Sequence, residues 1–409
     1  NATYRQITGE EETLKTTDAI FEKQLHAYTI THAIDDRNVL KFHIDYFKGE
    51  GTVNAKPGEV IAQQAVAEAI IDKHNAATNQ RKFNAVLATA SINNAIEYFR
   101  LFKAIQERKK SEDEDYVPLN IACVFSPPAQ LIAQNGDQQS QKNAADIKQL
   151  QEDLAQEKED NKQNPEEKKQ ALIEIIADYN KQFGTNHDIN NFDIYYQDIQ
   201  RRIKDQKFTN KDYPHKNKID ITIVVDMLLT GFDSKYLNTL YVDKNLKYHG
   251  LIQAFSRTNR VLNDTKPYGN VLDFRSQQEA VNQAITLFSG EDGGKAKEIW
   301  MVDPAPVVID QYQKAVEALG DFMKEHNLIN EPQEVYNLRG DAAKIAFVKN
   351  FKEVQRLKTQ LDQYTDLDEQ QQETIEAILP KDNLQEFRSS YLETAKQLRE
   401  IQQKEGEDA

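Results

Sequence analysis

The hydrophobic positions of this chain form short apolar runs separated by longer stretches with helical spacing. The runs are short and rich in β-branched residues, as strands buried on both faces are. They lie at residues 39–46, 83–89, 119–125, 221–225, 239–242 and 269–274. Segments with helical spacing, such as 62–74 and 91–102, lie between most of them. Strands that alternate with helices predict an α/β fold with a parallel sheet.

Beyond residue 276 no strand pattern persists, and prolines and glycines punctuate a series of helical patterns. These patterns cover residues 280–288, 307–325, 342–364, 370–378 and 383–404. A chain of 409 residues is too long for one ordinary core. We therefore expect a connector at 1–45, an α/β domain at 46–275 and an all-α domain at 276–409. In the connector, residues 16–18 could cap a short helix, and a second helix is expected near 31–35.

Two polar stretches interrupt the α/β pattern. Residues 134–170 are poor in aromatic residues and rich in Gln, Lys, Glu and Asp, with a helical pattern near 147–154, and another helical pattern follows at 172–183. We interpret the region near 134–184 as an exposed helical insertion with a loop at 161–165. The second stretch, residues 192–207, is a basic helical pattern that either contacts phosphates or is an ordinary charged helix face.

Charge is distributed unevenly along the chain. The formal net charge is −15, and residues 276–409 hold 26 acidic and 15 basic residues, so −11 of the total lies there. The α/β part is near balance and leaves room for a local basic groove, whereas the acidic C-terminal third should face water or a protein rather than DNA.

Other features bound the class of protein. No run of eighteen apolar residues predicts a membrane span, and the N-terminus has no signal-peptide pattern. The first residue is not Met, so we expect a fragment of a longer protein. Cys123 is the one cysteine, which excludes an internal disulfide and a cysteine-based zinc cluster and fits a reducing cytoplasm. No metal site is predicted.

The strongest candidate site follows the run at 221–225. Asp226 ends this run, and the loop behind it contains Thr230, Gly231, Phe232 and Asp233. After the next strand, a helical pattern contains Gln253, Arg257 and Arg260, whose spacing predicts that they share one helix face. Arg is always charged and binds phosphate oxygens through two N–H groups at once. Two guanidiniums and an amide, expected just beyond the carboxyl ends of two strands, therefore indicate a polyphosphate site.

These residues carry a resemblance to a known family. Asp226 with Gly231-Phe232-Asp233 resembles motif V of the superfamily 2 helicases and translocases, and the stretch from Gln253 to Arg260 resembles motif VI, with Ser256 where that motif usually has Gly. The wording of residues 228–244 and 253–261, with flanking sequence such as residues 4–9 and 38–40, is similar to the restriction (R) subunit of type I restriction-modification enzymes. The resemblance covers essentially the whole chain.

The resemblance implies a second RecA-like motor domain followed by a helical domain, in a bacterial cytoplasmic enzyme. Arg257 and Arg260 would act on the γ-phosphate of ATP, with Gly231, Asp233 and Gln253 also in the nucleotide cleft. Nucleic-acid contacts would come from Thr89, Ser91, Ser126 and Thr230, although Ser91 could simply cap its helix. The partners implied are duplex DNA and the methyltransferase (modification) and specificity subunits.

What the sequence lacks limits what it can do by itself. No G-x-x-x-x-G-K-S/T phosphate loop, no acidic Mg²⁺ motif and no nuclease signature is present. ATP and Mg²⁺ would then be bound mainly by a first motor domain, and this chain alone should neither hydrolyse ATP nor cut DNA. Two alternatives stay open: another superfamily 2 motor acting on DNA or RNA, or a binding module that keeps a relic of the helicase fold.

Overall fold

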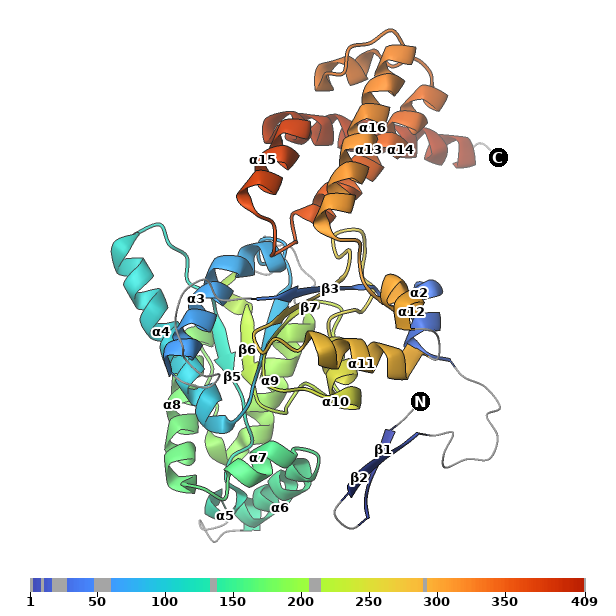
Figure 1. Cartoon of the computed structure of the whole chain (residues 1–409). Coiled ribbons are helices and arrows are strands. Elements are labelled where there is room, and N and C mark those ends of the chain that lie inside the picture. Colours follow the sequence, from blue (N-terminus) through green and yellow to red (C-terminus); the bar gives the residue numbers. More distant parts are fainter. Residues whose placement is uncertain are drawn as a thin grey trace. The chain divides into compact units, whose positions relative to one another are not determined.

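A computed structural model describes residues 3–8, 11–16, 28–47, 60–132, 138–205, 215–289 and 293–407. The chain divides into two compact units, residues 1–302 and 303–409. Figure 1 follows the chain through both units.

The first unit is built on a six-stranded sheet in the order β3-β8-β7-β4-β6-β5. Every neighbouring pair is parallel, which confirms the predicted sheet type. The strands are β3 (Phe42–Tyr46), β4 (Asn84–Thr89), β5 (Ile121–Cys123), β6 (Ile221–Val224), β7 (Leu237–Asp243) and β8 (Gly269–Asp273). The four central strands are buried along their whole length, which explains their nearly continuous apolar runs.

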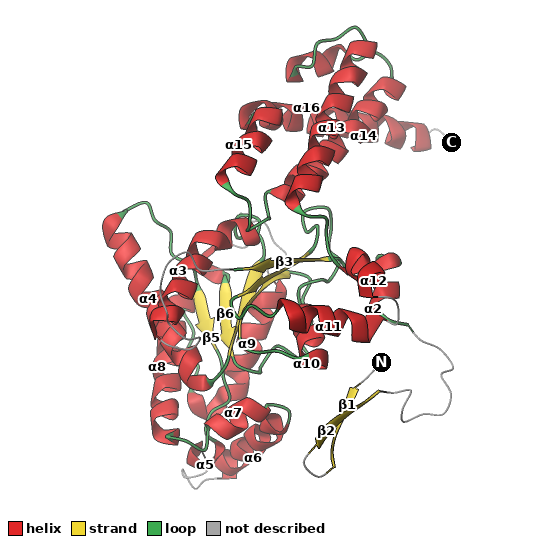
Figure 2. Ribbon diagram, viewed as in Figure 1, coloured by secondary structure: helices red, strands yellow, loops and turns green. Residues whose placement is uncertain are grey.

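Helices flank this sheet, as Figure 2 shows. Between β3 and β6 the chain forms α3 (Val60–Ala77), α4 (Ile92–Glu112), α5 (Ala129–Ile132), α6 (Gln138–Glu152), α7 (Ala155–Asp160), α8 (Pro165–Phe183) and α9 (Phe192–Asp205). After β7 come α10 (Tyr248–Phe255) and, beyond β8, α11 (Gln278–Ser289) and α12 (Gly293–Trp300). Among the described residues, no helix is long and apolar enough to cross a bilayer.

The insertion is less exposed than its composition suggested. Ala144, Ile147 and Leu154 are buried in the same apolar cluster as the sheet residues. Polar residues of α6 and α7 are buried as well, and Glu157 has no exposed surface. The expected exposure was wrong because the apolar positions of the insertion are too few to give a strong amphipathic pattern. Buried hydrogen bonds make much of the contact between the insertion and the sheet.

The boundary between the two units lies later than residue 276. α11 and α12 bury Val281, Ile285, Phe288 and Trp300 in the core of the first unit. Trp300 also donates a hydrogen bond from Nε1 to Thr31 Oγ1 at 3.0 Å, which ties α12 to α2 (Ile30–Asp35). Our expectation that the C-terminal domain begins at 276 was therefore wrong, because the helical pattern alone does not show which core a helix joins.

The second unit is all-helical, as predicted. It contains α13 (Ala305–Glu325), a short 3-10 segment (Pro332–Asn337), α14 (Asp341–Leu361), α15 (Glu369–Ile378) and α16 (Lys381–Glu407). Phe347 and Phe351 of α14 have no exposed surface, and the Phe351 ring stacks on Phe387 of α16 with centroids 5.9 Å apart.

The N-terminal residues include a strand pair that was not predicted. Residues 3–8 and 11–16 form an antiparallel pair, β1 (Thr3–Thr8) and β2 (Glu11–Thr16). The short helix expected after residues 16–18 lies outside the described residues, whereas α2 confirms the helix expected near 31–35.

Candidate functional site

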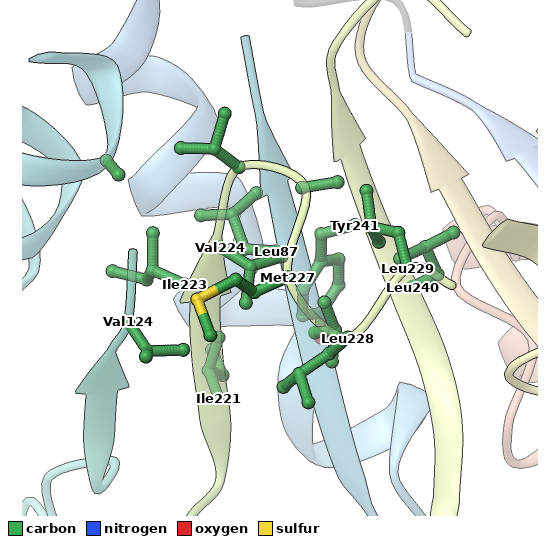
Figure 3. Close-up of a cluster of buried hydrophobic side chains, with 14 of the residues drawn as sticks. Leu87, Val124, Ile221, Ile223, Val224, Met227, Leu228, Leu229, Leu240 and Tyr241 are labelled. Carbon is green, nitrogen blue, oxygen red and sulfur yellow. The ribbon is translucent and has the colours of Figure 1, made fainter. Parts of the chain in front are cut away.

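The segment between β6 and β7, residues 225–236, connects opposite ends of the sheet. It leaves the carboxyl end of β6 at Val224 and enters the amino end of β7 at Leu237. Met227, Leu228 and Leu229 are buried, and Figure 3 shows them clustered with sheet residues such as Ile223 and Tyr241. Leu228 has a φ of 65° and Gly231 a φ of 70°, so two residues of the segment lie in the left-handed region.

The helix that carries Gln253 ends earlier than predicted. α10 stops at Phe255, and Arg257 and Arg260 lie beyond it rather than on one helix face. The Thr258 hydroxyl donates to the Phe255 carbonyl at 2.8 Å, and Leu40 N donates to the Asn259 carbonyl at 2.8 Å. Arg260 then pairs with Val39 in an isolated antiparallel bridge. These contacts hold the chain extended where local spacing still favoured a helix.

Both arginines nevertheless contact the β6–β7 segment. The Arg257 guanidinium donates to the Phe232 carbonyl and, through Nε, to the Gln253 carbonyl at 3.0 Å. Arg260 Nε and Asp233 Oδ1 form an ion pair at 2.7 Å, with 39% and 64% of the two side chains exposed. The structure therefore brings Asp233, Gln253, Arg257 and Arg260 together, with Gly231 on the same segment.

The two guanidiniums influence each other. Burial lowers the pKa of Arg257, the charge of Arg260 lowers it further, and Asp233 opposes the shift. Arg257 stays charged at neutral pH despite this shift, because an arginine pKa starts far above that range. Two neighbouring guanidiniums with one exposed carboxylate paired to Arg260 make a site that an additional anion would stabilise.

The arginines lie at the amino end of the sheet, not beyond the carboxyl ends as we expected. Arg260 pairs with Val39, which precedes β3, and Asp233 precedes β7. The reason is the β–α–β connection: α10 starts after the carboxyl end of β7 and returns the chain toward the start of β8.

The four residues predicted to contact nucleic acid are in different environments. Thr89 and Ser126 have no exposed surface, and the Thr89 hydroxyl donates to the Val224 carbonyl at 2.9 Å. Ser91 is partly exposed and accepts a hydrogen bond from Asn94 N at 3.1 Å, so it caps α4 as its alternative interpretation held. Thr230 is exposed. Thr89 and Ser126 thus support the strand ends, whereas Ser91 and Thr230 are accessible.

Two arginines of the basic helix α9 form ion pairs with an aspartate of the same helix. Asp198 pairs with Arg201 at 2.5 Å and with Arg202 at 3.0 Å. Burial tends to raise the pKa of Asp198, but the hydrogen bonds from Tyr179 and both arginines outweigh it and lower that pKa to about 2. The guanidinium of Arg202 also lies 4.4 Å from the Phe183 ring centre. This arrangement favours the ordinary charged face over a phosphate contact for these arginines.

Gly269 is required for the turn that positions the arginines. A Cβ atom at this position would lie 2.4 Å from Thr258 Oγ1 and 3.0 Å from the Thr258 carbonyl carbon. We expect Gly269→Ala to displace residues 258–259 and to lower the free energy of unfolding by about 1–3 kcal/mol. Urea unfolding measures this change. Gly250→Ala is the control, because a Cβ at Gly250 meets nothing within 4 Å, and it should be neutral or stabilising.

Lys266 is a buried lysine next to the same site. Its Nζ donates to the carbonyls of Lys235 at 2.9 Å and Leu237 at 3.0 Å. Burial lowers its pKa to about 7 from 10.5, with Asp233 opposing and Arg260 adding to the shift. Between these two values the unfolded chain binds more protons than the folded one, so this lysine makes stability rise with pH.

We therefore expect the stability difference between the native chain and Lys266→Met to depend on pH. Between pH 7 and 10 it should shift in favour of the native chain by up to about 1.4 kcal/mol per pH unit. Urea unfolding at several pH values measures the slope. Exposed Lys235→Met should show no such slope, and a flat difference for Lys266→Met would contradict the lowered pKa.

Several site residues had no signal in the sequence. Glu157 accepts hydrogen bonds from Ser126 N at 2.6 Å, Asp226 N at 2.9 Å and Met227 N at 3.2 Å. Asp160 accepts from Ile92 N at 2.7 Å. Both acids belong to a uniformly polar stretch, so neither stood out from its neighbours.

Comparison with known proteins identifies the family. A family model described as type I restriction enzyme subunit R domain 3 matches residues 81–276, and one described as type I restriction and modification enzyme, subunit R C terminal, matches residues 300–409. The chain belongs to the R subunit family of type I restriction enzymes. In this R-subunit chain the first match contains strands β4 to β8, and the second match contains the all-helical second unit.

Curated relatives support the same family. An endonuclease subunit of a type I restriction enzyme from Staphylococcus saprophyticus is 30% identical over 391 residues, covering 90% of this chain and 37% of the relative. Another from Staphylococcus aureus strain COL is 31% identical over 348 residues, covering 77% of this chain and 33% of the relative. The chain thus spans about a third of the length of these relatives.

Proposed function

We propose that this chain supplies the second half of the ATP cleft in the motor of a type I restriction subunit, which translocates duplex DNA before cleavage. The observation that carries the proposal is the attachment of Arg257 and Arg260 to residues 232–233 at one end of a parallel sheet. The β6–β7 segment begins at the carboxyl end of the sheet and contacts both arginines at the amino end, so it connects the two ends. Such a segment is suited to link a nucleotide site with a nucleic-acid path.

The chemistry proposed for the arginines is charge stabilisation. Arg260 is partly exposed and paired with an exposed carboxylate, so it is free to exchange Asp233 for a phosphate oxygen. Arg257 is fixed by two carbonyls and would hold its charge beside it. ATP with Mg²⁺ supplies the transferable γ-phosphoryl group, whose negative charge these guanidiniums would stabilise as an arginine finger does.

The remaining parts of the reaction are proposed to lie elsewhere in the subunit. This sequence has no phosphate loop, and among the described residues no cluster of His, Cys, Asp or Glu could hold a metal ion. We infer that another domain binds most of ATP and Mg²⁺ and that the chain alone neither hydrolyses ATP nor cleaves DNA. Accessible Ser91 and Thr230 are the side chains that we propose as contacts to the DNA backbone.

We propose that the second unit docks the subunit on the methyltransferase, while the specificity subunit selects the DNA target in the bacterial cytoplasm. The unit is acidic and exposes several large apolar side chains, which is typical of a protein-binding surface. These side chains are Val307, Ile329, Tyr336, Ile345 and Leu392.

The direct test measures ATP turnover by the full-length subunit assembled with its methyltransferase. We expect stimulation by duplex DNA and little response to single-stranded or duplex RNA. Stimulation by RNA would favour another class of superfamily 2 motor, and no stimulation by either would favour a non-enzymatic binding module.

A further inference from the structure

Helix α7 of the insertion is joined to the β6–β7 segment by buried hydrogen bonds. The Glu157 carboxylate has no exposed surface and accepts from the backbone N–H groups of Asp226 and Met227, the first residues of the turn after β6, as well as from Ser126 N. Burial raises the pKa of Glu157, and the N–H donors of Ser126 and Asp226 oppose that shift. Burying a carboxylate costs free energy unless hydrogen-bond donors surround it, and here the donors come from the turns after β5 and after β6.

Asp226 returns the contact. Its Oδ2 accepts from Gln156 N at 2.9 Å and Glu157 N at 3.4 Å, which satisfies N–H groups in the first turn of α7. Lys244, just after β7, pairs with the other carboxylate oxygen and donates to the Val225 carbonyl at 2.8 Å. The start of the β6–β7 segment is therefore fixed by α7 on one side and by Lys244 on the other.

The rest of the segment has little freedom to absorb a displacement at Asp226. Met227, Leu228, Leu229 and Phe232 are all buried, and Leu228 is held at positive φ, which costs a leucine energy unless packing enforces it. The far end of the segment contacts both arginines through Phe232 and Asp233.

We propose that Glu157 is a positioning residue for the arginine site. In this arrangement α7 sets the path of the β6–β7 segment, and the insertion thereby provides a second input to the nucleotide cleft. The inference rests on the proposed function for its consequence in turnover, but not for the structural coupling itself. It predicts that a change at α7 reaches Arg260 at the opposite end of the sheet.

The test compares Glu157→Gln with Glu159→Gln in the full-length subunit assembled with its methyltransferase. Glutamine keeps the size of the side chain, but its NH₂ group cannot accept hydrogen bonds from backbone N–H groups. Glu159 lies on the same helix, is exposed and pairs with Lys162 at 2.5 Å, so it is a matched control. We expect Glu157→Gln to lower kcat for DNA-stimulated ATP turnover roughly 10- to 100-fold, as a small misplacement of a catalytic group does. Glu159→Gln should match the native subunit.

Hydrogen exchange provides a readout that does not depend on activity. In Glu157→Gln, backbone exchange should accelerate across residues 226–236 and also at 253–260. Acceleration confined to 155–161 and 226–227 would show a local structural role and would overturn the proposal, as would an unchanged kcat. If the native subunit showed no DNA-stimulated turnover, the proposed function would fail while the exchange data still tested the coupling.

A second variant guards against loss of folding. Leu154→Ala removes a buried apolar side chain directly before α7 and leaves the Glu157 carboxylate in place. We expect the same pattern of exchange and a smaller fall in kcat. If Leu154→Ala accelerated exchange throughout α7 but left residues 228–260 and kcat unchanged, the proposal would be wrong.

Discussion

Arg260→Ala should lower DNA-stimulated ATP turnover of the assembled subunit by about two orders of magnitude or more, while ATP binding is retained. The guanidinium is partly exposed and paired with Asp233, so its loss removes a charge without opening the core. A residue that acts mainly on charge developing during the reaction lowers kcat rather than binding. Turnover kinetics and the binding of a fluorescent ATP analogue measure the two quantities separately.

The matched control for this prediction is Arg100→Ala. Arg100 is an exposed arginine of α4 that lies 3.9 Å from Glu174, and the proposed cleft does not use it. The Arg100→Ala subunit should therefore turn over ATP like the native subunit. Arg260→Lys keeps a charge but loses the planar fork, so its turnover should fall between those of the native subunit and Arg260→Ala. Native turnover in Arg260→Ala would remove Arg260 from the cleft and favour the binding-module alternative.

Phe351→Ala should lower the free energy of unfolding of the second unit by about 3–5 kcal/mol. Phe351 has no exposed surface, and its ring lies between Phe347 on its own helix and Phe387 and Tyr391 on α16. Removing it leaves a cavity in the small core that joins α14 to α16. Calorimetry of the whole chain should show one transition move to lower temperature.

Ile345→Ala on the same helix controls for helix propensity and for loss of apolar surface. Ile345 is 52% exposed, so its replacement should change stability by less than about 0.5 kcal/mol. If the second unit docks the methyltransferase, Phe351→Ala should also weaken that complex, which a pull-down with the purified partner would show. Equal effects of the two substitutions on the free energy of unfolding would contradict the buried position of Phe351.

The sheet could be predicted from sequence because its strands are buried on both faces and interrupted by clear helices. For the arginine site, the candidate residues came from a sequence motif, but their geometry could not be predicted. Arg257 and Arg260 keep helical spacing, yet Asn259 bonds to Leu40, more than two hundred residues away in sequence, and the helix ends at Phe255. A contact so distant along the chain leaves no local pattern to detect.

Other differences have similar causes. The short helix α12 begins at two glycines and has few apolar positions, so it was not predicted, although Trp300 is buried by it. Glu157 resembles its acidic neighbours in every sequence property. Its importance follows from three backbone donors contributed by two separate turns, which only the folded chain brings together.

The pairing of Val39 with Arg260 has a mechanical consequence. Leu40 and Asn259 exchange two hydrogen bonds beside this pair, and Gly269 N donates to the Lys41 carbonyl at 2.9 Å. Residues 39–41, which lead into β3, are therefore hydrogen-bonded to residues 259–260 and 269. A pulling force applied ahead of residue 38 would be delivered to the backbone of Arg260 before it reached the rest of the sheet, and a chain cut to residues 81–276 would lose this tether together with an edge strand.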